Sequence, residues 1–208
     1  MSFFSADGPF NTFMTLVFDL VVLNFLWIIC SIPLITLGAS SIALYTIMLK
    51  RVRNNEGYII KGFFGALKSN FKESLPMTLL YLALNIVAVL DLLIIRNWEN
   101  TAASILMGLF LFLAIVILAI FSYVWPLMAK FENTRMNTLK NACILAVGKL
   151  PITIVLVLLN GLPLFLFFLL PQVFIYVIWI YPFFGFSLTA YLNSKLLAPL
   201  FDKLIANE

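Results

Sequence analysis

The sequence contains no histidine, the side chain that most often serves as general base, proton switch and transition-metal ligand. Its two cysteines, Cys30 and Cys143, lie in apolar stretches without CxxC spacing, which is typical of packing residues and not of a disulfide framework. Charged residues make up only 11% of the chain, and no Walker A motif is present. We therefore predict a non-enzymatic protein that uses no cofactor.

The composition is that of an integral membrane protein. Hydrophobic residues make up 63% of the 208 residues, and the mean hydropathy is +1.10, far above soluble domains. Continuous apolar runs that can cross about 30 Å of hydrocarbon favour helices over a barrel. The first run lacks the features of a cleavable signal peptide, so we expect it to stay in the mature protein. We predict an all-α, polytopic transmembrane helix bundle, one domain over 1–208, with five spans at about 12–34, 76–95, 102–129, 151–170 and 173–192.

Basic residues are distributed unevenly between the two sides of this predicted bundle. Of the 13 Lys and Arg residues, all but Arg96 lie between spans one and two, between spans three and four, or after span five. The positive-inside rule then predicts the N-terminus outside and the C-terminus inside. Because the net charge of +4 belongs to these loops, it gives no reason to expect a nucleic-acid partner.

Two segments on the predicted cytoplasmic side are expected to form interfacial helices, at about 39–52 and 59–75. In the second, aromatic residues recur at helical spacing and lysines share a neighbouring face: Phe63, Phe64, Phe71, Lys61, Lys68 and Lys72. This pattern is typical of a helix in the headgroup region with its lysines near anionic lipid. Two interpretations stay open, a surface helix that closes a hairpin and a docking helix for a partner.

An internal similarity suggests a two-hairpin repeat. "SLPMTLLYLALN" at 74–85 matches "KLPITIVLVLLN" at 149–160 with a constant offset of 75 residues, pairing Pro76 with Pro151 and Thr78 with Thr153. Parallel repeats occur in membrane proteins. The chain is rich in Leu and Ile, so a chance similarity is the open alternative.

Asp19 is the main polar candidate inside a span, since an ionisable group at membrane depth is costly and suggests function. It could lie on a cation or proton path, contact a polar substrate or partner subunit, or be structural through hydrogen bonds. No Lys or Arg lies inside a predicted span, so a cationic partner within the chain must come from a span end. We expect Asn24, Asn85 and Asn160 to hydrogen-bond between helices.

Aromatic residues suggest where the spans end and bend. Trp98 and Trp125 fall near opposite span ends, as expected of an aromatic belt. In the aromatic segment 174–186, Pro182 and Gly185 are expected to kink the last span and leave a face for another helix.

The stretch "SIPLITLGASSIALYTIMLKRVRNNEG", residues 31–57, combines an S-x-P-x-x-T-x-G-A pattern, an A-L-Y triplet and a basic loop, and "FFGALKSNFKESLP" follows it. In these features the chain resembles the YesL-like family of bacterial multi-pass membrane proteins. The resemblance implies a location in the bacterial plasma membrane and a frequent association with sugar ABC importers, and it carries over no catalytic residues. The candidates for partner or interface contact are Pro33, Thr36, Gly38, Tyr45, Lys61, Phe63, Phe64, Lys68, Phe71 and Lys72.

From this resemblance we predict a non-enzymatic accessory membrane subunit of an ABC-type carbohydrate import system, packed against the permease subunits. The alternative is a self-contained transporter or channel for a small solute. Membrane lipid is a further expected partner, and a homo-oligomer is left open.

Overall fold

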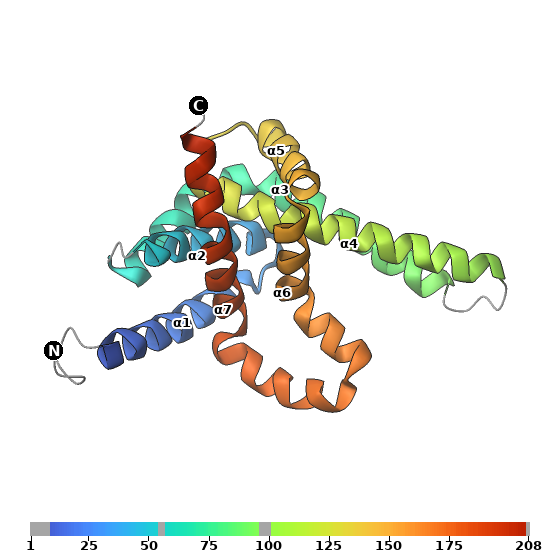
Figure 1. Ribbon diagram of the computed structural model, residues 1–208, viewed down its shortest axis with the longest axis horizontal. Coiled ribbons are helices and arrows are strands. Elements are labelled where there is room, and N and C mark those ends of the chain that lie inside the picture. Colours follow the sequence, from blue (N-terminus) through green and yellow to red (C-terminus); the bar gives the residue numbers. More distant parts are fainter. Residues whose placement is uncertain (1–8, 54–56, 96–100, 207–208) are drawn as a thin grey trace.

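The computed structural model describes residues 9–53, 57–95 and 101–206; Arg96 and Trp98 lie outside these ranges. Within them the chain is helical and has no strand, which confirms the all-α prediction (Figure 1). The elements are α1 Pro9–Ser31, the 3₁₀ turn η1 Leu34–Thr36, α2 Leu37–Val52, α3 Ile59–Ile95, α4 Thr101–Lys130, α5 Arg135–Gly148, α6 Leu150–Leu169 and α7 Pro171–Ile205. Of these, α1, α3, α4, α6 and α7 are long and apolar enough to cross a membrane, as the five apolar runs predicted.

The second apolar run does not begin a helix of its own at Pro76, because Pro76 lies inside the continuous helix α3. An internal proline removes one backbone hydrogen bond, but residues on both sides of it are held by packing, since Phe63 and Thr78 are fully buried. At 1.5 Å per residue, the 37 residues of α3 extend about 55 Å, well beyond the hydrocarbon thickness. Helix α3 therefore joins the predicted interfacial helix and the second span in one element.

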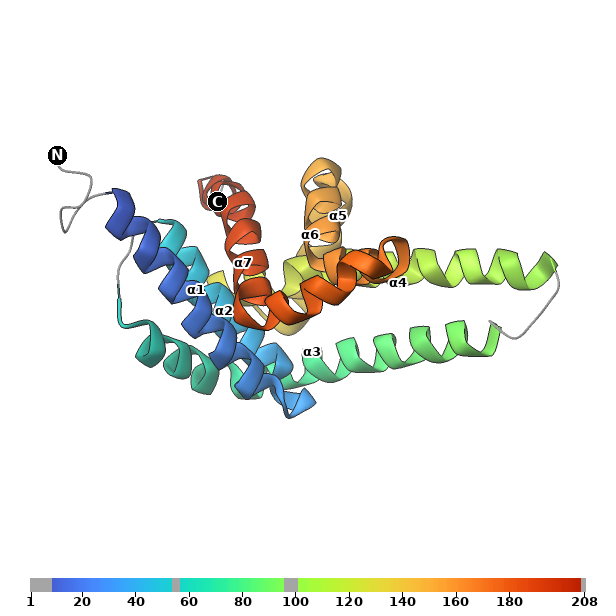
Figure 2. The ribbon, with the colours of Figure 1, turned by 90° about the horizontal axis from the view of Figure 1, so that it is seen from below.

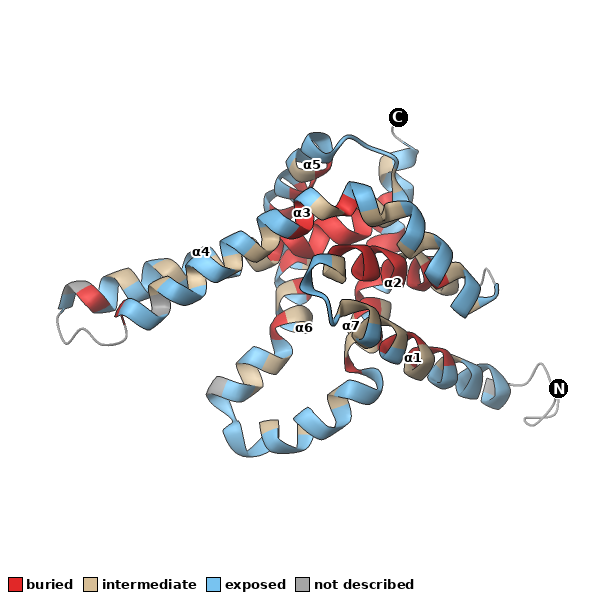
Figure 3. Ribbon diagram, turned by 180° about the vertical axis from the view of Figure 1, so that it is seen from behind, coloured by how far each residue is buried: buried red, intermediate tan, exposed pale blue. Residues whose placement is uncertain are grey.

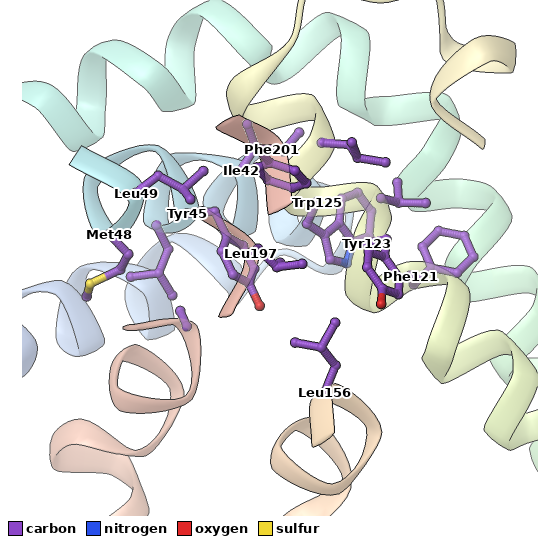
Figure 4. Packing of buried hydrophobic residues seen from close by; sticks show 14 of the residues in the cluster. Ile42, Tyr45, Met48, Leu49, Phe121, Tyr123, Trp125, Leu156, Leu197 and Phe201 are labelled. Carbon is purple, nitrogen blue, oxygen red and sulfur yellow. The ribbon is translucent and has the colours of Figure 1, made fainter. Parts of the chain in front are cut away.

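Helix α2 forms the centre of the fold. Nearly every residue from Gly38 to Leu49 is buried, because α2 is in contact with α1, α3, α4 and α7. Figure 3 shows the buried residues gathered here, and Figure 4 shows Tyr45 of α2 in the same cluster as Trp125 of α4. The helix expected at 39–52 is present, but it is buried among other helices and not exposed on a surface, because its small residues let those helices approach closely on several sides.

Two apolar hairpins project from this centre. The outer halves of α3 and α4 run side by side beyond the other helices, and α6 with the first part of α7 forms a second hairpin in a different direction (Figures 1 and 2). Their large apolar side chains are exposed, for example Ile86 at 58%, Phe112 at 61% and Trp179 at 75%. Surfaces of this kind suit lipid or the helices of another membrane protein.

The predicted kink in the last span is present where α7 changes direction between its orange and red parts (Figure 1). Pro182 lies inside α7, and the side-chain amide of Asn24 in α1 donates to the Pro182 carbonyl at 2.6 Å and to the Tyr181 carbonyl at 3.4 Å. The Asn24 carbonyl oxygen also accepts from the Ser187 backbone N–H at 2.9 Å. As expected, the kinked region provides a face on which another helix packs, and that helix is α1.

The two segments of the internal similarity share local bonds but differ at their prolines. Thr78 donates to the carbonyl four residues earlier at 2.8 Å, and Thr153 does the same at 3.1 Å. Pro76 lies inside a helix, whereas Pro151 lies in the first turn of α6 after the break at Gly148. A true duplication stays a prediction.

Candidate functional site

The turn between α1 and α2 contains two residues of the family-like pattern, Pro33 and Thr36. Pro33 is exposed, and so are its apolar neighbours Ile32 and Leu34, at 73% and 60%. The Thr36 hydroxyl can donate to the carbonyl of Cys30 or of Pro33, and the Thr36 backbone N–H donates to the Pro33 carbonyl at 2.9 Å. The turn thus satisfies the polar groups of Thr36 internally and presents an apolar surface, which suits contact with hydrocarbon.

After this turn α2 runs back along α1. Ser31 and Ser40 share a hydrogen bond of 2.6 Å, and the Trp27 indole N–H donates to the Ser41 hydroxyl at 3.1 Å. Farther along, Arg51 at the end of α2 forms a salt bridge of 3.0 Å with Asp19. The two helices are therefore antiparallel over most of the length of α2.

Gly38 lies where three helices meet. A Cβ atom at this position would be 2.0 Å from the hydroxyl oxygen of Thr78 in α3 and 2.9 Å from the Trp125 ring in α4. Only glycine permits this approach. Gly38 is a buried packing residue, so it is not available for direct contact with a partner.

Asp19 is 5% exposed and pairs with Arg51, which supports the structural interpretation over an ion path. As expected from the sequence, the cationic partner of Asp19 comes from outside the predicted spans, since Arg51 lies between the first and the second of them. Arg53 forms a second ion pair with Asp202 near the end of α7. This pair is more exposed, and pairs of this kind contribute little to stability. Together the two pairs hold the basic end of α2 between α1 and α7.

The first part of α3 has one buried face and one basic face. Phe63 is fully buried, and Leu67 and Phe71 are partly buried. Lys61, Lys68 and Lys72 are exposed on the side turned away from these residues. Phe63 therefore packs within the chain, while Phe64, at 47% exposure, stays at the surface beside the lysines.

A chain of hydrogen bonds crosses the centre of the molecule and links four helices. The Asn193 side-chain amide in α7 donates to the Tyr45 hydroxyl at 2.9 Å and to the Asn160 carbonyl oxygen at 3.1 Å. The Asn160 amide in α6 donates to the Ser122 hydroxyl in α4 at 2.9 Å. Asn193 is fully buried, yet its own carbonyl oxygen has no hydrogen-bond partner among the described residues. Tyr45 thus belongs to an internal network and does not face outward.

The network borders a half-open cavity of about 220 Å³. Its walls combine aromatic rings with hydroxyl and amide groups from α1, α2, α3, α4, α6 and α7, and none of the described residues that line it is charged. The aromatic residues are Trp27, Tyr45, Tyr81, Phe121, Trp125, Tyr181 and Phe186, and the other polar ones are Ser41, Ser122, Asn160 and Thr189. Because Trp125 is 7% exposed and lines this cavity, its predicted place in an interfacial aromatic belt is wrong.

The sequence indicated part of this network. Asn24 and Asn160 bond between helices as predicted. The bond found for Asn85 stays within α3, from its amide to the Tyr81 carbonyl at 2.8 Å. Asn193 was not predicted as a site residue, although a further asparagine beyond the fifth apolar run was the one signal that could have identified it.

A second hollow, of about 1160 Å³, lies between the first part of α3 and the connection from α4 to α5. It is polar and carries charges of both signs, from Lys50, Glu73, Lys130, Glu132 and Arg135. Such mixed charge suits a peptide segment of another protein better than an anionic or cationic small molecule.

Residues 20–92 match the family model described as "Protein of unknown function, DUF624". The match covers the second half of α1, all of α2 and most of α3, and it agrees with the family resemblance drawn from the sequence. No curated protein matches the chain, and no solved structure does.

Proposed function

We propose that this protein is a non-enzymatic accessory membrane subunit of an ABC-type carbohydrate import system in the bacterial plasma membrane. The observation that carries the proposal is the α3–α4 hairpin, which projects beyond the other helices (Figure 2). Many large apolar side chains on its outer halves are exposed. Helix packing in membranes needs such a surface on each partner. The resemblance of 31–57 to a family often encoded beside sugar importers indicates which partner to test first.

The cytoplasmic side provides a second contact region. The hollow around Glu73, Lys130 and Arg135 lies next to the basic face of α3, so a charged cytoplasmic loop of the permease could bind across both. Contacts of this type favour orientation and rate of association more than affinity. The apolar hairpin then supplies most of the binding surface, and the charged region fixes the orientation of the permease relative to this protein.

Site-specific photo-crosslinking in intact membranes tests this proposal. A photoreactive amino acid replaces Ile86 or Phe112 on the exposed hairpin surface, and a matched control carries it at Ile42, which is fully buried. We expect the two exposed positions to crosslink to an importer permease and the buried position to crosslink within the chain. Crosslinks from Ile86 and Phe112 to lipid alone, or to a second copy of this chain alone, would overturn the proposal.

A second candidate, a self-contained transporter or channel for a small neutral solute, is supported by the central uncharged cavity. The pairing of Asp19 with Arg51 argues against coupling to a proton or cation at that position. Uptake into liposomes that contain only this protein separates the two functions. Saturable uptake without a permease supports the carrier, and a rate equal to that of empty liposomes rejects it.

A further inference from the structure

We propose that the central cavity is a binding site for a small, uncharged, polyhydroxylated molecule of about monosaccharide size. This inference does not depend on the proposed importer partner. It rests on the size of the cavity, the chemistry of its walls and the state of the hydrogen bonds around it.

The volume sets the class of ligand. A cavity of about 220 Å³ holds the equivalent of roughly seven liquid waters. Drug-sized ligands occupy pockets of about 300–1,000 Å³, so this cavity is too small for an oligosaccharide or a lipid headgroup with its glycerol. A single small ring fits the space.

The walls set the polarity of the ligand. The absence of charged side chains among the described lining residues means that a charged ligand would lose its hydration without a counter-ion, which is costly in a low-dielectric site. The rings of Trp125, Tyr81 and Phe121 cluster, with centroids 4.8 to 5.9 Å apart. They offer flat apolar walls to a ligand with C–H-bearing faces.

The hydrogen bonds around the cavity leave unused capacity. The Tyr45 hydroxyl accepts from Asn193, and the Ser41 hydroxyl accepts from Trp27. Each therefore keeps an O–H proton to donate, and the described residues show no acceptor for it. Buried polar groups are rarely left unsatisfied, so two unused hydroxyl donors among the residues that line one cavity indicate a ligand that brings hydroxyl groups.

An apolar ligand and ordered water are the two competing occupants. Water alone would satisfy the polar groups but would leave the aromatic walls facing water, whereas an apolar molecule would cover the rings and leave the hydroxyls unpaired. A cyclic polyol satisfies the polar groups and also covers the aromatic rings, because its ring faces are apolar and its edge carries hydroxyls.

The test uses the full-length protein in nanodiscs and measures thermal shift and tryptophan fluorescence, since Trp27 and Trp125 line the cavity. The probes are four neutral rings (glucose, galactose, mannose and myo-inositol), two charged analogues (glucuronate and glucosamine) and apolar cyclohexane. We expect saturable binding of at least one neutral polyol at millimolar concentration or below, and at least tenfold weaker binding of the charged analogues.

Substitutions assign the binding to this cavity. Tyr45→Phe keeps the ring and removes one donor, so affinity should fall roughly tenfold, the equivalent of one hydrogen bond. Tyr176→Phe is the matched control, because Tyr176 is 72% exposed on the outer part of α7. The affinity of the Tyr176→Phe variant for the polyol should be unchanged. A thermal midpoint of Tyr45→Phe near that of the parent protein shows that the fold is retained, and Ser41→Ala provides an independent variant if it is not.

Three results would overturn the proposal. These are no binding of any neutral polyol, cyclohexane binding at least as tight as polyol binding, or equal affinity in the Tyr45→Phe, Ser41→Ala and Tyr176→Phe variants. The binding assay contains no permease, so a failure to bind polyols does not contradict the proposed importer function. Equally, a failure to crosslink to a permease does not contradict the proposed binding site.

Discussion

The carboxylate of Asp19 lies 3.0 Å from the guanidinium of Arg51, across the antiparallel contact between α1 and α2. Both side chains are largely buried, at 7% and 18% exposure. The pair therefore fixes the register of two helices that are joined by a turn of only a few residues.

We predict that Asp19→Asn destabilises the protein, because it leaves a largely buried guanidinium without this carboxylate. Breaking a buried pair from one side costs about 3–5 kcal/mol, and the thermal unfolding midpoint in detergent measures the loss. The control is Asp91→Asn, a partly exposed carboxylate in α3. The double variant Asp19→Asn with Arg51→Gln should recover part of the stability. Equal midpoints for the Asp19 and Asp91 variants would contradict the structural role.

Gly38→Ala is predicted to be strongly destabilising, because the new methyl group would overlap the Thr78 hydroxyl and the Trp125 ring. Overpacking of this kind costs typically about 1–3 kcal/mol. Gly65→Ala is the matched control, since nothing lies within 4 Å of the place that its new Cβ atom would take, and alanine is favoured over glycine in a helix by up to about 1 kcal/mol. The thermal unfolding midpoint of Gly38→Ala should be lower than that of the parent protein, and the midpoint of Gly65→Ala should be equal or higher. Adding Thr78→Ala to Gly38→Ala should restore part of the loss, and no recovery would contradict the close contact as its cause.

The sequence predicted the helices well because membrane-length apolar runs are a local property of the chain. The five membrane-length apolar helices were predicted for this reason, and so was the bend in α7 at Pro182. The rule that a cation for Asp19 must come from outside the spans also followed from simple charge placement. Which cation it was could not be predicted, since Arg51 reaches Asp19 only through the antiparallel return of α2.

The burial of α2 and the cavity could not be predicted in the same way. Residues 39–49 are mostly apolar or small and are followed by basic residues, and a surface helix of a membrane protein has the same composition. The difference lies in contacts with four other helices. Likewise Tyr45, Asn160 and Asn193 are far apart in sequence, and only the packing of α2, α6 and α7 brings them together. The periodicity of the sequence does not predict contacts between residues so far apart in the chain.

The exposed lysines of α3 are predicted to bind anionic lipid. Lys61, Lys68 and Lys72 lie on one exposed face, and a lysine near an anionic membrane surface contributes about 1 kcal/mol. Replacing all three by Gln should reduce the number of phosphatidylglycerol molecules that native mass spectrometry finds on protein released from mixed nanodiscs. A triple Gln variant with the same net charge, at Lys130, Lys140 and Lys149, is the control. Equal lipid retention by the two triple variants would show that this face has no special role.

The α1–α2 hairpin bears on the topology of the chain in the membrane. Its turn is apolar and exposed at Ile32, Leu34 and Ile35, while its other end brings the first half of α1 beside the basic residues of α2. Helix α2 has 16 residues, about 24 Å, which is shorter than a full span. Combining this hairpin with the rule that basic residues lie in the cytoplasm, we predict that the hairpin enters from the cytoplasmic side with the N-terminus inside, whereas the sequence alone led us to expect it outside.

Cysteine labelling in intact cells tests this topology on a background with Cys30 and Cys143 replaced by Ser. We expect Asn11→Cys to react with a membrane-impermeant maleimide only after the cells are permeabilised, as Lys203→Cys should. Thr101→Cys, at the far end of the α3–α4 hairpin, should react in intact cells and serves as the external reference. Ile35→Cys should react poorly under both conditions, because water-soluble reagents do not reach hydrocarbon and a thiol there stays protonated. Labelling of Asn11→Cys in intact cells at the rate of Thr101→Cys would instead place the N-terminus outside and require α1 to cross the membrane completely.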